Sequence, residues 1–431
     1  MMNLTDVFIK GLVTQSQSIP KNVLFQAKKC LLDYLSCLVG GKGYYQQKLN
    51  LPEIGEDIQT DALRFGMYSH VLELDDGHRK GAVHVGAPVF SALIPVTLRF
   101  GIEPKDFFNG VIAGYEATVR LACAVQPGCR KRGYHASGIC GTVGAAIGIA
   151  TALKFNAEQM NTTIAAAVAG AAGVLEMQED GSDLKPYNVG RASMDAVVAT
   201  MMGKAGLKGP DDAIGGKRGF VAVMTDTPHL EQLTDFWGDT LAVEHVYRKE
   251  YAACRHAHPA IEAVLKIRPQ ITISEIEKIE VLTYLQATEG HSYIEIPTVS
   301  AAKMSIPFSV AVALVTGTAD MKAFSNENIT NKTILELTKK VEVKEDVNLT
   351  ALNPQKRVAI IVVHTKDRNY SQRVDYPKGE PENPLSKEEL ENKFRSMAIY
   401  GGLTMEECDV VIREIWQDDC SIEKIMKIVC K

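Results

Sequence analysis

The chain has 431 residues, of which 46% are hydrophobic and 23% are charged, and its formal net charge is -5. A chain of this length and composition can bury a large core without disulfides or metals, and its length favours two domains. The acidic balance argues against binding to nucleic acid or to an anionic membrane surface.

The N-terminal half predicts a succession of helices. Apolar residues recur with helical spacing between residues 23 and 38, and Gly40 and Gly41 are expected to end this helix. An uncharged segment, residues 136–153, contains too few large apolar side chains for a membrane span, so we expect a buried helix there. Further helices are expected over 88–100, 107–125 and 192–206, and two tightly packed ones between residues 141 and 175, with a start at Asn156 and Gln159.

The pattern changes near residue 270. Alternating β-branched and aromatic residues predict strands at 277–286, 357–365 and 369–376, the last two joined as a hairpin. Between these strands we expect helices at 305–316 and 330–339, and the C-terminal helices begin at two capping boxes, Ser386 with Glu389 and Thr404 with Glu407. The predicted fold is mainly α, with an all-helical domain (1–250), an α+β domain (251–392) and C-terminal helices (393–431) that return to the helical domain.

Nine cysteines are scattered along the chain, and none stands in a CxxC pair. This usage is typical of a reducing compartment, in which buried thiols act as small hydrophobic groups. The N-terminal segment lacks the long apolar core and small-residue cleavage site of a secretory signal. We therefore expect a cytoplasmic protein.

Six of the ten histidines fall in three short segments that are also rich in charge. The first segment, residues 69–88, holds His70, Glu73, Asp75, Asp76, His78, Arg79, Lys80 and His84. The second, residues 131–142, holds His135, and the third, residues 247–263, holds Lys249, Cys254, Arg255, His256 and His258. A further basic group, LKPYNVGR, contributes Lys185 and Arg191.

Each segment also has a simpler interpretation. The first could be a solvated polar turn, His135 could be a hydrogen-bonded structural histidine, and Lys185 and Arg191 could line an exposed face. The first segment also offers metal ligands, but their spacing matches no standard pattern, so no metal is expected. Cys254 could act as a nucleophile beside Arg255 and His258, because neighbouring cations favour the thiolate.

Taken together, these segments predict a site for a small molecule that carries two or three carboxylates. Removal of a proton alpha to a carboxylate places negative charge on oxygens, and fixed cations in a dry cleft stabilise that charge while a histidine or lysine takes the proton. The sequence has no dinucleotide-binding GxGxxG, no P-loop and no GxSxG elbow, so neither a nucleotide cofactor nor serine-hydrolase chemistry is expected.

The same segments resemble the MmgE/PrpD family, which includes 2-methylcitrate dehydratases, cis-aconitate decarboxylase and iminodisuccinate epimerase. The resemblance runs in order along nearly the whole chain, through HVLELDDGHRKGAVHVGAP, GYEATVRL, GYHASGICGTVGAA, LKPYNVGRAS, GKRGFVAVM and KEYAACRHAHPAIEAV. It implies a large all-helical domain, a smaller α+β lid domain, a homodimer, and an active site between the domains without metal or organic cofactor.

The resemblance also implies roles for individual residues. Glu73 stands where the decarboxylase has an active-site aspartate, and His84, His135, Lys185 and Lys249 match the family's histidine and lysine positions. These last four are the expected catalytic residues, supplying base, acid and charge stabilisation. The residues expected to contact the substrate are Glu73, Asp76, Arg79, Arg191, Cys254, Arg255 and His258.

Three departures bear on the reaction. Gly77, Cys254 and Phe308 stand where the decarboxylase has threonine, histidine and tyrosine, which weakens the case for decarboxylation of cis-aconitate. The leading hypothesis is a lyase, most simply a 2-methylcitrate dehydratase-like hydro-lyase. An epimerase or racemase of a dicarboxylate, a cis-aconitate decarboxylase-like enzyme and a non-catalytic carboxylate-binding protein are the alternatives.

Overall fold

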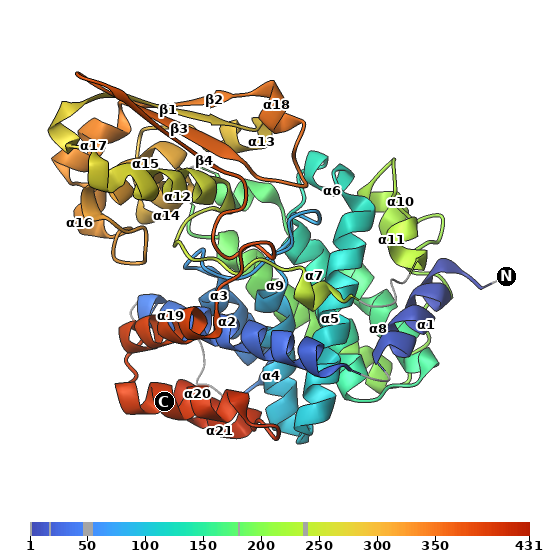
Figure 1. Cartoon of the computed structure of the whole chain (residues 1–431). Helices are drawn as coiled ribbons and strands as arrows, with labels where there is room; N and C mark the ends of the chain where they lie inside the picture. The colour runs from blue at the N-terminus through green and yellow to red at the C-terminus, as the bar shows by residue number, and fades with distance from the viewer. Residues whose placement is uncertain (1, 17–18, 46–54, 180–181, 236–239) are drawn as a thin grey trace.

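The computed structural model describes residues 2–16, 19–45, 55–179, 182–235 and 240–431. Helices dominate these residues, and a four-stranded sheet lies at one end of the molecule (Figure 1). The mainly α class predicted from the sequence is confirmed. The buried hydrophobic residues form two clusters, a large one among the N-terminal and C-terminal helices and a smaller one beneath the sheet.

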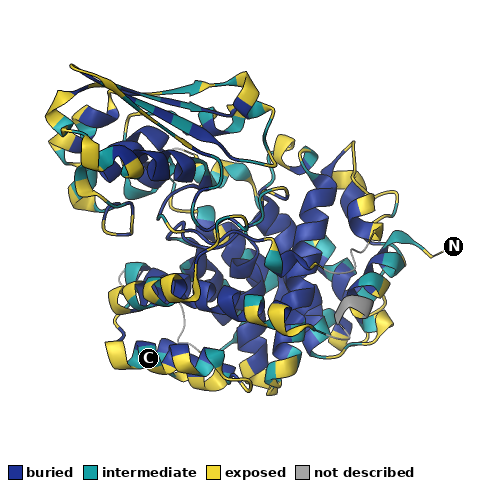
Figure 2. Ribbon diagram, in the orientation of Figure 1, coloured by how far each residue is buried: buried dark blue, intermediate teal, exposed yellow. Residues whose placement is uncertain are grey.

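The larger core is built from long helices that pack against one another. Helices α5 and α7 lie at its centre, where their residues are almost all buried (Figure 2). The N-terminal helices are α1 (Leu4–Ser16), α2 (Lys21–Tyr45), α3 (Ile58–His70), α4 (Gly86–Phe100), α5 (Pro104–Val125), α6 (Gly128–Lys131), α7 (Ala136–Ala152), α8 (Ala157–Gly170), α9 (Lys185–Lys204), α10 (Phe220–Met224) and α11 (Glu231–Thr234).

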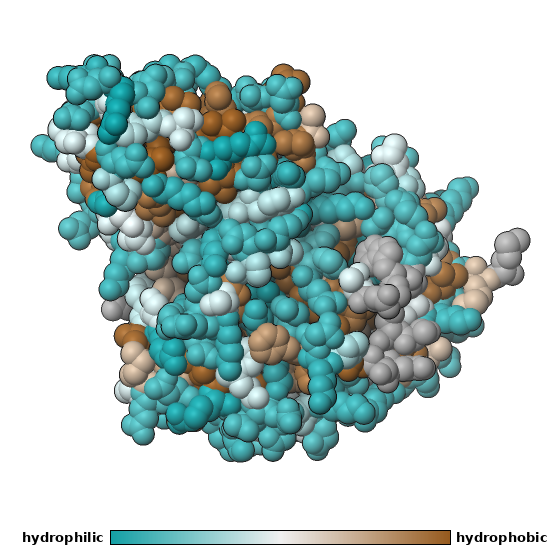
Figure 3. Space-filling model, in the orientation of Figure 1, coloured by the Kyte–Doolittle hydropathy of each residue, from teal (hydrophilic) through white to brown (hydrophobic). Residues whose placement is uncertain are grey.

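Small residues bring α5 and α7 into close contact. A Cβ atom on Gly144 would lie 1.9 Å from the hydroxyl oxygen of Thr118, so only glycine fits there. The buried helix expected over 136–153 is therefore confirmed as α7, and the capping box of Asn156 and Gln159 begins α8. Among the described residues, no helix is long and apolar enough to cross a membrane. The face seen in Figure 3 is mostly hydrophilic, with hydrophobic residues showing in smaller areas.

Helix α2 does not end where the sequence analysis placed its end. It continues through Gly40 and Gly41 to Tyr45. A Cβ atom on Gly41 would lie 1.8 Å from the carbonyl oxygen of Tyr68 in α3. The two glycines thus serve the close approach of neighbouring elements, and the prediction of a helix stop was wrong.

The sheet has the strand order β2-β1-β3-β4, with β1 (Ile276–Thr283), β2 (Val341–Glu345), β3 (Ala359–Thr365) and β4 (Asn369–Val374). Strand β1 pairs in parallel with β2 and antiparallel with β3. The predicted hairpin of β3 and β4 is confirmed, whereas β2 was not predicted. Helices α12 (His258–Ile267) and α15 (Ile306–Thr316) cover one face of the sheet (Figure 1).

The remaining helices complete the two clusters. Around the sheet lie α13 (Leu285–Thr288), α14 (Val299–Met304), α16 (Asn326–Ile329), α17 (Lys332–Thr338) and α18 (Val347–Thr350). The chain ends with α19 (Lys387–Tyr400), α20 (Met405–Trp416) and α21 (Ile422–Val429). Both predicted capping boxes are present at the starts of α19 and α20, and α19 packs against α2.

Candidate active site

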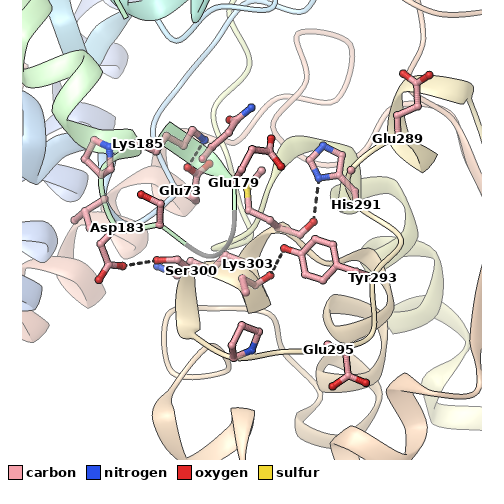
Figure 4. Close-up of a pocket in the computed structure, with 18 of the residues that line it drawn as sticks. Glu73, Glu179, Asp183, Lys185, Glu289, His291, Tyr293, Glu295, Ser300 and Lys303 are labelled. Carbon is pink, nitrogen blue, oxygen red and sulfur yellow. Dashed lines mark hydrogen bonds and ion pairs between the residues drawn. The ribbon is translucent and has the colours of Figure 1, made fainter. Parts of the chain in front are cut away.

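Two adjoining cavities bring together residues from the histidine-rich segments. The larger has a volume of about 490 Å³ and is shown in Figure 4. The smaller, of about 90 Å³, shares part of its lining with the larger one. Its walls include all four residues expected to be catalytic and also Glu73, Cys254 and Arg255, which were expected to contact the substrate.

Glu73 lies between two lysines that are distant in the sequence. Its Oε1 atom pairs with Lys185, the first residue of α9, and its Oε2 atom lies 3.2 Å from Nζ of Lys249. Burial alone would raise the pKa of Glu73, but the two lysines outweigh it and hold the pKa well below its usual value. The backbone of Glu73 has a φ of 55°, a left-handed conformation that is strained for a residue other than glycine.

The carboxylate of Asp75 connects two histidines. Its Oδ2 atom lies 2.8 Å from Nδ1 of His70 and 3.0 Å from Nδ1 of His84. Burial would raise the pKa of Asp75, but the two imidazoles outweigh it and keep the pKa well below its usual value. The sequence analysis noted Asp75 within the first segment and did not assign it to the site.

These contacts fix the tautomer of His84. Its Nδ1 atom faces two acceptors, the Asp75 carboxylate and the carbonyl oxygen of Asp76 at 2.9 Å, so Nδ1 carries the hydrogen. The Nε2 atom is then left with its lone pair. Burial lowers the pKa of His84 to about 4, so the ring is neutral at pH 7 and able to accept a proton.

His135 precedes the first residue of α7 and is buried. Its Nδ1 atom lies 3.5 Å from the side-chain amide of Asn188, which donates to it. Burial also lowers the pKa of this histidine well below its usual value. His135 is thus a second neutral imidazole, with the opposite tautomer to His84, and its Nε2 atom carries the hydrogen.

Asp76 occupies a different position from its neighbour. Its Oδ1 atom accepts from the backbone N–H of Gly86 at 2.7 Å, and its Oδ2 atom accepts from the hydroxyl of Tyr115 at 2.6 Å. Burial raises the pKa of this carboxyl to about 6. The structure therefore places Asp76 under the first turn of α4, where it joins that helix to α5, and not in the lining of either cavity.

The arginines expected to hold carboxylates are paired within the protein. Arg79 and Arg255 both contact Glu380, at 3.1 and 2.7 Å, and Arg255 also donates to Nδ1 of His258 at 2.8 Å. Arg191 pairs with Asp195 one turn further along α9, at 2.8 Å. Of Arg79, Arg191, Arg255 and His258, which were all expected to contact the substrate, Arg255 alone lines one of the two cavities.

Other cations face the cavities instead. Arg357 lines the smaller one, and its buried Nε atom has no hydrogen-bond partner among the described residues. Lys303, from α14, lines the larger one and donates to the carbonyl of Leu72 at 3.2 Å. Burial lowers the pKa of Lys303 to about 8. Arg357 and Lys303 lie outside the histidine-rich segments from which the sequence analysis predicted the site.

Cys254 lines the smaller cavity, as does His291, which the sequence analysis did not identify. The Sγ atom lies 4.0 Å from Nε2 of His291. Figure 4 shows His291 on the opposite side of the larger cavity from the Lys185–Glu73 pair. Phe308 is fully buried in the core beneath the sheet, among the apolar residues of that cluster.

In the part of the chain that the structure describes, two groups of side chains have the spacing of metal ligands: His70 with Asp75 and His84, and Cys254 with His256 and His291. In the first group, the two histidine Nδ1 atoms that approach Asp75 are occupied by hydrogen bonds to it. In the second, the surrounding charges are cationic, with Lys249, Arg130 and Arg357 acting on His256. Both arrangements fit proton transfer and anion binding better than a metal ion.

Comparisons with known proteins identify the family of the chain. The model of the MmgE/PrpD N-terminal domain matches residues 53–233, and that of the MmgE/PrpD C-terminal domain matches residues 251–418. The cis-aconitate decarboxylase of Mus musculus is 23% identical over 384 residues, and that of Homo sapiens is 24% identical over 378 residues. Each alignment covers 83% of this chain and 76% of the relative. The chain therefore belongs to the MmgE/PrpD family.

Proposed function

We propose that the protein is a lyase that removes a proton alpha to a carboxylate of a small di- or tricarboxylic acid, in the manner of a 2-methylcitrate dehydratase-like hydro-lyase. The observation that carries this proposal is the lone pair of His84, which Asp75 orients in the small cavity that Lys185 and Lys249 also line. None of the steps assigned below needs a metal ion or an organic cofactor.

Binding begins with the cations. A substrate carboxylate in the small cavity would meet the guanidinium of Arg357, and a second carboxylate that reaches into the larger cavity would meet Lys303. Arg357 and Lys303 are themselves buried, which strengthens each of these interactions. Five Lys and Arg residues and a single acid, Glu73, line the smaller cavity, and this positive charge favours a di- or tricarboxylate as the substrate.

Proton removal then falls to His84. Its Nε2 atom takes the proton from the carbon next to a carboxylate, and Asp75 stabilises the imidazolium that forms. The negative charge that moves onto the carboxylate oxygens is stabilised by Lys185 and Lys249, which Glu73 holds in place. The Nε2–H of His135 supplies a further donor to the same oxygens.

The outcome after proton removal separates the candidate reactions. The relatives are named as cis-aconitate decarboxylases. At three positions at which the decarboxylase is expected to carry polar side chains, this chain has Gly77, Cys254 and Phe308, and Phe308 lies in the core. These differences favour elimination of water over decarboxylation. Epimerisation of a dicarboxylate remains the second candidate, because the site presents neutral and charged proton-transfer groups on more than one wall.

Proton NMR of the purified protein in D2O tests the proposal. Citrate, 2-methylcitrate, cis-aconitate, malate and iminodisuccinate are offered in turn. We expect one of the hydroxy acids to lose its alpha hydrogen and its hydroxyl group as water and to give an unsaturated acid. Recovery of the acid with deuterium at its alpha carbon, with retained or inverted configuration and without loss of water, would instead identify an epimerase. Binding without any exchange or loss of an alpha proton would contradict the proposal and indicate a non-catalytic carboxylate-binding protein.

A substitution of Lys185 tests its proposed role in catalysis. Lys185→Ala should abolish turnover and leave folding intact, because it removes one of the two cations that stabilise the developing charge. Lys204→Ala, at the exposed end of the same helix, is the control and should retain full activity. Full activity of Lys185→Ala would contradict the proposed role of the lysine.

We also propose that the protein works as a cytoplasmic homodimer. The family resemblance supports the dimer, and the nine cysteines, all free, support a reducing compartment. Light scattering on the eluate of a size-exclusion column should give about twice the chain mass of 47.1 kDa. A mass equal to that of one chain would contradict the dimer.

A further inference from the structure

The thiol of Cys254 faces a histidine with a defined tautomer. Nδ1 of His291 lies 3.1 Å from the carbonyl oxygen of Met304, so Nδ1 carries the hydrogen and donates it. The Nε2 atom, 4.0 Å from Sγ of Cys254, is therefore the lone-pair nitrogen. A proton can pass from sulfur to Nε2 without any change in the Nδ1 hydrogen bond.

The backbone holds the two side chains in register. The N–H of Cys254 donates to the carbonyl of Lys303 at 2.8 Å, and the N–H of Ile306 donates to the carbonyl of His291 at 2.9 Å. Cys254 is thus tied to the end of α14 and His291 to the start of α15, although 37 positions separate them in the sequence. Both are buried, and both line the small cavity.

We propose that Cys254 and His291 form the second proton-transfer pair of the site and deliver the proton that completes the reaction begun at His84. This inference rests on the proposed function. In the resting state the thiol has given its proton to Nε2 of His291, so the ring is an imidazolium and the sulfur is a thiolate. During turnover that proton returns to sulfur, and sulfur gives it to the departing hydroxyl of the substrate.

The protons and bonds balance in this sequence. His84 takes the alpha proton, the carbon–carbon double bond forms as the carbon–oxygen bond breaks, and the hydroxyl leaves as water with the proton from the pair. The site is left with a protonated His84 and a neutral His291 beside the thiolate. Loss of one proton from His84 to solvent and uptake of one by His291 restore the starting state.

The surrounding charges favour the ion pair. Burial would raise the pKa of Cys254, but His291, followed by Lys185, outweighs it, and the pKa falls to about 6 while Glu73 opposes the shift. Burial would lower the pKa of His291, but the thiolate outweighs it and raises the pKa, while Arg130 opposes. The ring of His256 stacks on His291 at 5.0 Å, and the phenols of Tyr284 and Tyr293 complete the surroundings.

The other eight cysteines differ from Cys254. Burial raises the pKa of every one of them: Cys30, Cys37, Cys123, Cys129, Cys140, Cys408, Cys420 and Cys430. A thiolate is the reactive form of cysteine, so one thiol of the nine should react rapidly near pH 7. This contrast allows the pair to be tested without knowledge of the substrate.

The first test is the rate of alkylation by iodoacetamide, followed by peptide mass spectrometry between pH 5 and 9. In the wild-type protein, we expect selective alkylation of Cys254 with a midpoint near pH 6. His291→Asn keeps a donor for the Met304 carbonyl and removes Nε2. Its midpoint should move toward that of an ordinary thiol, about 8.5, and its rate at pH 7 should fall about two- to threefold, because the greater nucleophilicity of the more basic thiolate offsets part of the loss. Cys430→Ser, at the partly exposed C-terminal end, is the control and should react as the wild type does.

The second test separates the two proton transfers in D2O. Cys254→Ser and His291→Asn should retain exchange of the alpha proton, which depends on His84, and should lose net elimination by about 10²-fold or more. Equal melting temperatures would show that both variants fold. Unchanged elimination in both variants, or an alkylation midpoint that does not move in His291→Asn, would overturn the pair. The alkylation midpoint could shift in His291→Asn although the wild-type protein exchanges the alpha proton of no acid in the panel. That result would confirm the Cys254–His291 ion pair, and it would contradict both the proposed function and the proton delivery that depends on it.

Discussion

Asp75 and Asp76 are adjacent in the sequence, but their side chains contact different parts of the fold. Asp75 faces the imidazoles of His70 and His84, whereas Asp76 accepts from Gly86 and Tyr115. Both aspartates follow the turn after α3, in which Glu73 has a positive φ. Two adjacent carboxylates thus serve different neighbours, one of them beside the proposed base and the other at the start of α4.

Asp75→Asn should lower kcat by about 10²- to 10⁴-fold, because a neutral asparagine no longer stabilises the imidazolium that forms on His84. Substrate binding should change little, since the cations that bind carboxylates are untouched. Steady-state kinetics with the acid identified by NMR measure both quantities. Asp226→Asn removes an exposed aspartate that pairs with Arg132 and is the charge-matched control. A wild-type kcat in Asp75→Asn would contradict the assignment of His84 as the base.

The sequence could predict many of the residues that meet at the site and not their detailed pairing. Clustered His, Lys and Arg residues indicated a polycarboxylate, and six of them line one cavity: His84, His135, Lys185, Lys249, Arg255 and His256. It could not show that Glu380, more than a hundred residues away, pairs with Arg79 and Arg255. Such pairing depends on tertiary contacts that no local pattern records. For the same reason Lys303 and His291, isolated in the sequence, were missed.

At the scale of elements, Asp76 stabilises the start of α4. It contacts the first residue of that helix, Gly86, where the backbone N–H groups have no partner within the helix. Asp76→Ala should lower the free energy of unfolding by about 1–3 kcal/mol, because it leaves a buried N–H and a buried hydroxyl without acceptors. Urea denaturation measures the change. Tyr115→Phe removes only one of the two hydrogen bonds and should cost less. Equal stabilities for Asp76→Ala and the wild type would contradict this role.

The contact of α2 with α3 gives a second test at this scale. Gly41→Ala should lower the free energy of unfolding by about 1–3 kcal/mol, because the new methyl group would overlap the carbonyl of Tyr68. Gly170→Ala is the control, since a Cβ atom there meets nothing closer than 3.8 Å. Thermal or urea denaturation of the two variants measures the two losses of stability. Equal losses in both would indicate a general effect of the methyl group and not a helix contact.

Local signals predicted most elements and failed where packing decides. Capping boxes and apolar spacing located the starts of α8, α19 and α20. Strand β2, VEVKE, is short and carries charges on a half-exposed surface, so its alternation is weak and it was missed. The glycines in α2 signalled a stop by local propensity, but their function is a close contact that forms only in the folded chain.

At the scale of the whole molecule, buried neutral histidines make stability depend on pH. His258 is fully buried, accepts from Arg255 through Nδ1 and donates to the carbonyl of Ala253 through Nε2. Both nitrogens are therefore engaged in the neutral form, and burial followed by Arg255 lowers the pKa well below its usual value. Between the folded and unfolded pKa values the unfolded chain binds the additional proton, so stability falls as the pH drops below about 6.5.

Lowering the pH from 7 to 5 should therefore lower the free energy of unfolding, with His258 contributing about 2 kcal/mol. His84 and His135 act in the same direction, whereas Asp76, with a pKa raised to about 6, acts in the opposite direction and offsets part of the loss. Urea denaturation at the two pH values measures the sum. His258→Gln keeps an acceptor and a donor but cannot take up a proton, so its stability should fall by about 2 kcal/mol less over the same interval. Parallel pH dependence in the variant and the wild type would mean that His258 does not titrate between the two states.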